Sequence, residues 1–131
     1  MLFTPDSPSA LSLLPGLRHR KLVLASASPR RKQLIGMLGI PFEVRPIGAD
    51  EIYPKEITGP DIPRFLSELK ARAAVSTLSP EEILITSDTV VQLDGQTLEK
   101  PASPEEAFRM IRALSGRTHE VTTGFTIVDG R

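Results

Sequence analysis

A run of hydroxyl and basic side chains near the start of the chain could bind an anion. Residues 26–32 read Ser-Ala-Ser-Pro-Arg-Arg-Lys and follow a short apolar stretch. Ser28 followed by Pro29 predicts a helix that begins there, with Ser28 as its N-cap. Free N–H groups at a helix start favour an anion, and the guanidinium groups of Arg30 and Arg31 match phosphate oxygens. A solvated basic turn is the commoner case on charge alone, but the order of strand, hydroxyl residues and helix favours phosphate.

Carboxylates at two further places could hold a cation or accept a proton. Asp88 follows the apolar stretch Ile83–Thr86, at the end of an expected strand, where α/β sheets present ligands. Asp50 and Glu51 lie in a polar loop and offer oxygen ligands of the kind that Mg²⁺ accepts. A loop-capping or surface role is the plain alternative for each of them, and no single carboxylate decides the matter.

Two lysines and one histidine complete the candidates. Lys70 lies beside the apolar stripe of an expected helix, where a surface lysine with a packed stem is the default interpretation. Lys100 precedes Pro101, which favours an extended backbone, and a surface position is again the default. His119 lies in a polar segment, and a structural histidine that hydrogen-bonds a loop is the favoured interpretation there.

The elements that must position these residues alternate between strands and helices. Hydrophobic patterning and caps predict helices that begin at Ser28-Pro29, at Asp61 as a cap, and at the capping box Ser103–Glu106. Gly39 and Gly116 are expected to end the first and the third helix. Strands are expected at residues 21–25, 42–46, 83–86 and 121–128. The alternation predicts an α/β domain.

Two Asp-Gly pairs predict hairpin turns. Asp94-Gly95 would pair Leu93 with Gln96 and, counting outward, Thr89 with Lys100, which places Lys100 near Asp88. Asp129-Gly130 is a second turn signal, but the chain stops one residue later. Because an unpaired β-branched edge is usually avoided, this turn favours a chain that is truncated at its C-terminal side.

Composition narrows the class of protein. The 131 residues suit one domain, expected at 21–131 and preceded by a disordered tail at 1–20. Acidic and basic residues balance at 16 each, with no tryptophan and one tyrosine, which argues against nucleic acid. No segment reads as a signal peptide or membrane span, so no membrane partner is expected. The lack of cysteine fits a cytoplasmic protein.

The candidate motifs gain specificity from their order and spacing, which run from about Lys21 to the last residue. They are Ser26–Arg31, Asp50-Glu51, Glu68–Ala71, Ser87–Val91, Leu98–Pro101, and Leu114–Gly116 with His119 and Val121. In this order the set resembles the Maf family of nucleoside triphosphate pyrophosphatases. The resemblance implies a mixed sheet flanked by helices, as in Maf and inosine-triphosphatase-like proteins, with the C-terminal part of the domain missing.

The resemblance also implies a chemistry. Maf-like enzymes hydrolyse nucleoside triphosphates to the monophosphate and pyrophosphate with a divalent metal, Mg²⁺ or Mn²⁺. Pro-Arg-Arg after the serine resembles the branch that acts on dTTP, UTP and modified pyrimidine nucleotides. The implied roles are proton acceptor and metal ligand for Asp88, metal ligand for Glu51, triphosphate contacts for Lys70 and Lys100, a phosphate cradle for Ser28, Arg30 and Arg31, and base selection for Arg30 and Thr89.

Other interpretations stay open at this point. The chain could be an inactive nucleotide-binding fragment, which the isolated Asp129-Gly130 turn would suit. It could be an enzyme of the inosine triphosphate pyrophosphatase type, against which the Ser-Pro-Arg-Arg turn argues. A nucleic-acid binder is a poor third. The sequence leaves open whether the chain forms a homodimer.

Overall fold

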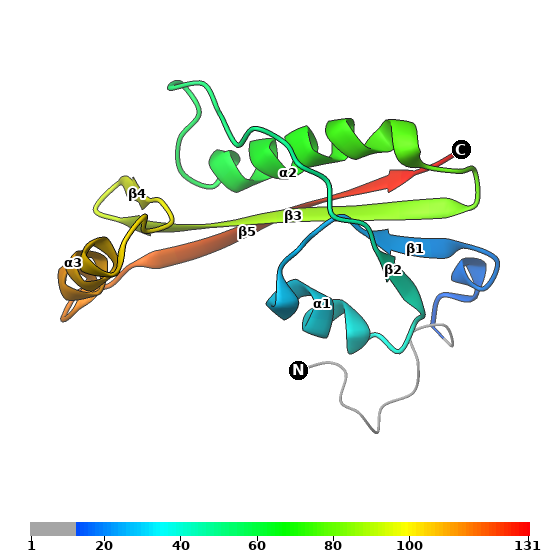
Figure 1. Ribbon diagram of the computed structural model, residues 1–131, viewed down its shortest axis with the longest axis horizontal. Coiled ribbons are helices and arrows are strands. Elements are labelled where there is room, and N and C mark those ends of the chain that lie inside the picture. The colour runs from blue at the N-terminus through cyan, green and yellow to red at the C-terminus, as the bar shows by residue number, and fades with distance from the viewer. Residues whose placement is uncertain (1–12) are drawn as a thin grey trace.

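The fold is a five-stranded mixed sheet with helices on both faces, as the sequence predicts (Figure 1). The computed structural model describes residues 13–131. The strands are β1 (Lys21–Leu24), β2 (Phe42–Val44), β3 (Glu82–Leu93), β4 (Gln96–Leu98) and β5 (Glu120–Asp129). The α-helices are α1 (Pro29–Gly36), α2 (Asp61–Ala74) and α3 (Pro104–Leu114), and short 3₁₀ helices lie at Pro15–Leu17 and Val75–Thr77.

The long strand β3 organises the sheet. One of its edges pairs with antiparallel β5 from Ile83 to Gln92. The opposite edge pairs first with parallel β1, as far as Ile85, and then with β4 from Val91 onward. Residues 86–90 therefore have a strand neighbour on one edge only, and this interruption is called the edge gap below. Asp88 lies at its centre, so the prediction that the strand ends at this residue is wrong.

The two faces of β3 are covered by different helices, because side chains alternate along a strand. The face that carries Leu84 packs against α2 in a cluster with Val23 and Ala74. The other face, which carries Ile83 and Ile85, packs against the side of α1. Figure 1 shows α2 and α1 on opposite sides of the sheet, and α3 beside the far end of β3 and β5.

The helix starts follow local signals in two of three cases. The Ser28 hydroxyl accepts a hydrogen bond from the Arg31 N–H at 3.4 Å, and Ser103 caps α3 through the Glu106 N–H at 3.1 Å. Both predicted caps are confirmed. The predicted cap at Asp61 is wrong, since Asp61 is already the first helical residue and Pro60 precedes it without a side-chain cap.

The two predicted helix ends agree with the structure to different degrees. Gly116 lies just past α3 with a φ of 72°, which suits the residue that ends a helix. The first helix ends at Gly36, three residues before the predicted stop at Gly39. Its last turn continues in tighter hydrogen bonds, such as Gly39 N–H to the Gly36 carbonyl.

The first hairpin forms with the predicted turn but is shorter than predicted. Asp94 and Gly95 both have positive φ, and Leu93 pairs with Gln96. The ladder stops at the pair Val91 and Leu98, so Thr89 and Lys100 are not strand partners. Lys100 instead follows β4 in an irregular segment that borders the edge gap.

Gly124 on β5 allows a close approach between the sheet and α2. It pairs with Asp88, and a Cβ placed on it would lie 2.6 Å from the Pro63 carbonyl carbon and the Arg64 nitrogen. Nearby, the Ser67 hydroxyl lies 2.8 Å from the Thr126 hydroxyl across the same interface. The start of α2 is therefore seated directly on the backbone of β5.

A largely buried ion pair between Arg45 and Glu82 lies at the first residue of β3. The guanidinium of Arg45 donates two hydrogen bonds to the carboxylate of Glu82, at 3.2 and 2.5 Å. The Glu82 side chain is 6% exposed. The hydrogen bonds from Arg45 are the main reason that the pKa of Glu82 lies at about 2, below its usual 4.5.

This pair should make the stability of the fold depend on pH. Because the pKa of Glu82 is lower in the folded chain than in the unfolded one, its contribution is complete above pH 4.5 and is lost as the pH falls towards 2. We expect Glu82→Gln to melt below the wild type at neutral pH and the difference to shrink through this window. Thermal melts from neutral to acidic pH measure it, and a pH-independent difference would contradict it.

Part of the predicted tail can be compared with the structure. Residues 1–12 of the predicted tail at 1–20 lie outside the described residues. Leu17 packs against the cluster around Leu22 and Ile40, and Arg20 pairs with Asp129. Between residues 13 and 131, none of the helices is long and apolar enough to cross a membrane.

Candidate active site

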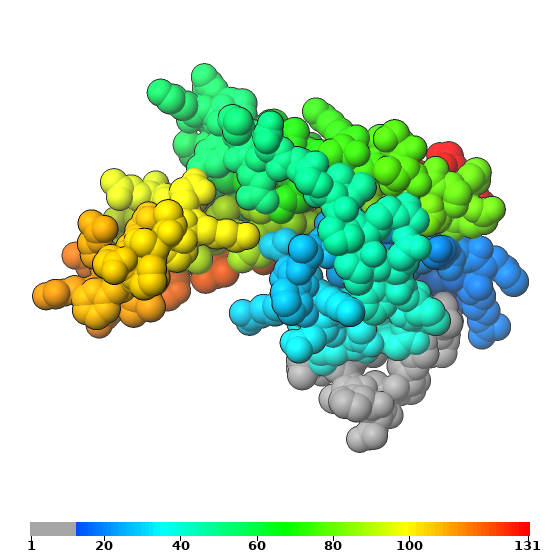
Figure 2. All heavy atoms as spheres, in the orientation of Figure 1, coloured from blue at the N-terminus to red at the C-terminus, as the bar shows by residue number. Residues whose placement is uncertain are grey.

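A cleft of about 330 Å³ lies at the edge gap of β3. Because no strand covers this edge between β1 and β4, the cleft is reached by side chains from both faces of the sheet. Figure 2 shows a hollow between the end of the molecule that carries β4 and α3 and the part formed by α1. The predicted site residues that line the cleft are Arg31, Glu51, Lys70, Asp88, Thr89 and Lys100.

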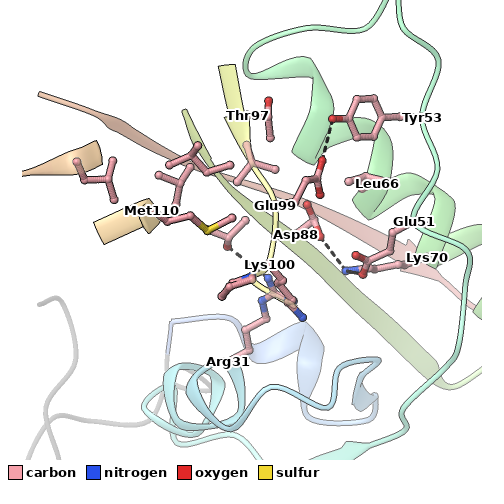
Figure 3. Close-up of a pocket in the computed structure, with 16 residues that line it drawn as sticks. Arg31, Glu51, Tyr53, Leu66, Lys70, Asp88, Thr97, Glu99, Lys100 and Met110 are labelled. Atoms are coloured by element: carbon pink, nitrogen blue, oxygen red, sulfur yellow. Dashed lines mark hydrogen bonds and ion pairs between the residues drawn. The ribbon is translucent and has the colours of Figure 1, made fainter. Parts of the chain in front are cut away.

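Asp88, Lys70 and Glu51 form a charged group inside this cleft. The Lys70 ammonium lies 2.9 Å from Asp88 Oδ1 and 3.0 Å from Glu51 Oε1. It also donates to the Ser87 carbonyl at 3.3 Å. The side chains of Asp88 and Lys70 are 9% and 14% exposed, whereas that of Glu51 is 48% exposed. Figure 3 shows the tip of Lys70 near both Glu51 and Asp88.

The position of Lys70 follows from the stripe of α2. Leu66 lies one turn earlier and belongs to a buried cluster with Ile62 and Val90. Lys70 continues the same helix face to the point where the sheet presents Asp88. The default expectation of a surface lysine is therefore wrong, because this side chain is largely buried and paired.

Arg31 and Thr89 connect this cleft to a second one. The Arg31 guanidinium donates to the Thr89 hydroxyl at 3.3 Å, and that hydroxyl lies 2.9 Å from the hydroxyl of Thr123. Both Arg31 and Thr89 also line a cleft of about 630 Å³ between α1 and the face of β5. Ser28 and Arg30 line only this second cleft, so the predicted phosphate-binding turn is divided between the two.

Tyr53 and Glu99 are cleft residues that sequence reasoning missed. The Tyr53 hydroxyl donates to Glu99 Oε1 at 3.2 Å, which links the loop that carries Glu51 to the segment that carries Lys100 (Figure 3). Burial, and then the charge of Glu99, raises the pKa of Tyr53. The signal available in the sequence was that the one tyrosine of the chain lies two residues after Glu51. His119 is exposed and lines neither cleft.

The carboxylates of the cleft are suited to a divalent cation only in part. Within residues 13–131, no group of three or more acidic or histidine side chains converges on one point. Glu51 and Asp88 nevertheless direct one oxygen each at the same cationic nitrogen, that of Lys70. Two carboxylates with open positions are the protein contribution expected for Mg²⁺ that also binds substrate phosphates. The donor set therefore fits such a cation if a ligand supplies further oxygens.

The fold and the site together define an α/β protein whose cleft, at an interrupted strand edge, combines a buried carboxylate with basic side chains. That combination suits a phosphorylated ligand and a cation. The family model described as "Maf-like protein" matches residues 21–131. The chain belongs to the Maf family, which confirms the resemblance found in its motifs.

Curated relatives are similar over most of the chain. A protein of Bacteroides thetaiotaomicron named dTTP/UTP pyrophosphatase is 46% identical over 113 residues, which are 86% of this chain and 58% of that protein. A protein of the same name from Exiguobacterium sibiricum is 49% identical, over 86% of this chain and 56% of its own length. One from Flavobacterium johnsoniae is 47% identical, over 82% and 55%. The matched part of the chain thus covers somewhat more than half of each relative.

Proposed function

We propose that the chain acts as a nucleoside triphosphate pyrophosphatase on dTTP and UTP, releasing the monophosphate and pyrophosphate. The observation that carries this proposal is a buried carboxylate, Asp88, held by Lys70 in a cleft that also receives Arg31 and Lys100. Family membership and the names of relatives that are 46–49% identical support the choice of nucleotides.

Asp88 is the proposed general base. It accepts a proton from the water that attacks the α-phosphorus, while the bond from that phosphorus to the bridging oxygen breaks and pyrophosphate leaves. Lys70, Lys100 and Arg31 offset the charge of the departing group. Fixed donors in a partly buried cleft do this more effectively than mobile water, since they are already oriented.

Glu51 and Asp88 are the proposed ligands of a divalent cation, Mg²⁺ or Mn²⁺. When bound, such a cation lowers the pKa of a coordinated water and neutralises phosphate charge. The exposed position of Glu51, at the mouth of the cleft, leaves room for the phosphate oxygens that would complete the coordination. Base selection is proposed for Arg30 and Thr89, which line the second cleft.

A nucleotide panel tests the proposed function. The 131-residue chain is incubated with dTTP, UTP, 7-methyl-GTP or ITP and with Mg²⁺ or Mn²⁺, and pyrophosphate release is measured. The Bacteroides thetaiotaomicron relative serves as the parallel control. We expect release from dTTP and UTP above that from the other two. Preferred hydrolysis of ITP would favour the inosine-triphosphatase type, and no release from any nucleotide would contradict the proposal for this chain.

Two further expectations belong to the proposal. A cytoplasmic location suits a cysteine-free enzyme that uses intracellular nucleotides. The second concerns a homodimer, for which analytical ultracentrifugation of the purified chain is the test.

A further inference from the structure

The ammonium group of Lys70 is already surrounded by oxygen atoms of the protein. A lysine ammonium has three N–H donors. In this structure two of them are used, one by the Asp88 carboxylate and one by the Ser87 carbonyl, and the Glu51 carboxylate forms an ion pair with the same ammonium at 3.0 Å. A phosphate that approaches Lys70 therefore competes with these three oxygen partners.

The same arrangement also opposes the binding of a cation to the two carboxylates. The carboxylate oxygens that would hold a divalent cation both contact this one ammonium, at 2.9 and 3.0 Å, and its charge offsets one of their two negative charges. A second cation entering alone would meet a like charge within a few ångströms, where repulsion is strong. A metal ion that binds alone therefore competes with the Lys70 ammonium. A triphosphate that binds alone competes with the carboxylates of Glu51 and Asp88.

The two partners of Lys70 differ in how easily they can leave. Glu51 is 48% exposed and sits on a loop, whereas Asp88 is 9% exposed on the central strand. Ion pairs near solvent are weak and readily exchanged, while buried pairs are costly to break. Exchange should therefore begin at Glu51.

We infer that Lys70 is an internal counter-ion that couples metal binding to nucleotide binding. When both ligands arrive, Lys70 passes from Glu51 to the triphosphate, and Glu51 passes from Lys70 to the metal. Each ligand removes the competitor of the other, so their binding is mutually reinforcing. The inference rests on the proposed function for the identity of the two ligands, but not on turnover.

Direct metal binding gives the first test. Binding of Mn²⁺ to the chain without nucleotide is measured from the loss of the free-ion signal in electron paramagnetic resonance. We expect weak binding by the wild type and binding tighter by roughly tenfold or more in Lys70→Gln, because the like charge is gone. Lys70→Arg keeps the charge and should stay weak. Lys55→Gln, at an exposed lysine of the same loop as Glu51, should match the wild type.

A second test replaces Glu51, the exposed partner of Lys70, because a substitution at this position should disturb the fold little. Affinity for the α,β-imido analogue of dUTP is measured in EDTA by calorimetry. Glu51→Gln removes the ion-pair partner that competes with a phosphate for Lys70, and it removes a negative charge, so we expect this metal-free affinity to rise several-fold. Glu56→Gln, an exposed neighbour, should leave it unchanged. Thermal melting shows that each variant is folded.

The outcomes separate this inference from the proposed function. Tighter Mn²⁺ binding in Lys70→Gln, or tighter analogue binding in Glu51→Gln, supports the coupling even if no nucleotide is hydrolysed. If folded variants show neither change, the coupling is overturned, even if the wild type releases pyrophosphate from dTTP. Should Lys70→Gln fail to fold, the result for Glu51→Gln decides alone.

Discussion

Replacing Asp88 with asparagine should lower the rate of pyrophosphate release by about 10²–10⁴-fold, the usual contribution of a positioned general base. Asparagine has the same shape but is a far weaker proton acceptor. The side chain is buried at the edge gap and lies 2.9 Å from Lys70, so little else can take its place. Initial rates with dTTP and Mg²⁺ measure the change.

The matched control is Asp94→Asn. It makes the same chemical change in the exposed turn between β3 and β4, where asparagine tolerates the positive φ of 51°. We expect wild-type rates from this variant. Asp88→Asn should still bind the α,β-imido analogue, which separates loss of chemistry from loss of the site. Wild-type turnover by Asp88→Asn would remove the residue from its proposed role.

Gly124→Ala should destabilise the fold by about 1–3 kcal/mol, the range for an atom forced into a well-packed interior. The added methyl group would lie 2.6 Å from backbone atoms of Pro63 and Arg64, which cannot rotate out of its way as a flexible side chain could. The helix α2 must shift instead. Urea unfolding monitored by circular dichroism measures the loss.

Gly48→Ala makes the same substitution where nothing lies within 4 Å of the new methyl group, and it should leave the stability nearly unchanged. Because α2 also carries Lys70, a displaced helix should disturb the contact with Asp88. Equal stability of the two alanine variants would mean that the helix and the sheet are less closely seated than the structure indicates.

The elements that were predictable from sequence are those with a local physical cause. Ser28 and Ser103 satisfy backbone N–H groups within their own first turn, so their caps depend on no distant residue. The Asp94-Gly95 turn likewise fixes the register from Leu93 to Gln96 by backbone conformation alone. The ordered motifs added the family, and with it the set of six residues that share the cleft.

The features that were missed depend on contacts between distant segments. Local patterning predicted strand segments on both sides of Asp88 but could not show that they form one continuous strand, because that continuity is stabilised by pairing with β5, whose partner residue at Asp88 is Gly124. The burial of Lys70 depends on the docking of α2, and the separation of Ser28 from Asp88 depends on which sheet face α1 covers. Hydrophobic patterning predicted the helix α3 but not what it packs against, and Ile111 on this helix is 68% exposed.

The paired edges on both sides of the gap have a consequence for motion. A strand that is paired at both of its ends opens only when several ladders break together. The amide hydrogens of β3 that are bonded to neighbouring strands should therefore be among the slowest to exchange with solvent. Asp88 is thus carried on a segment that does not fray. Movement that accompanies ligand entry and release is then expected elsewhere, in the loop that carries Glu51 and the segment that carries Lys100, which are joined by the hydrogen bond between Tyr53 and Glu99.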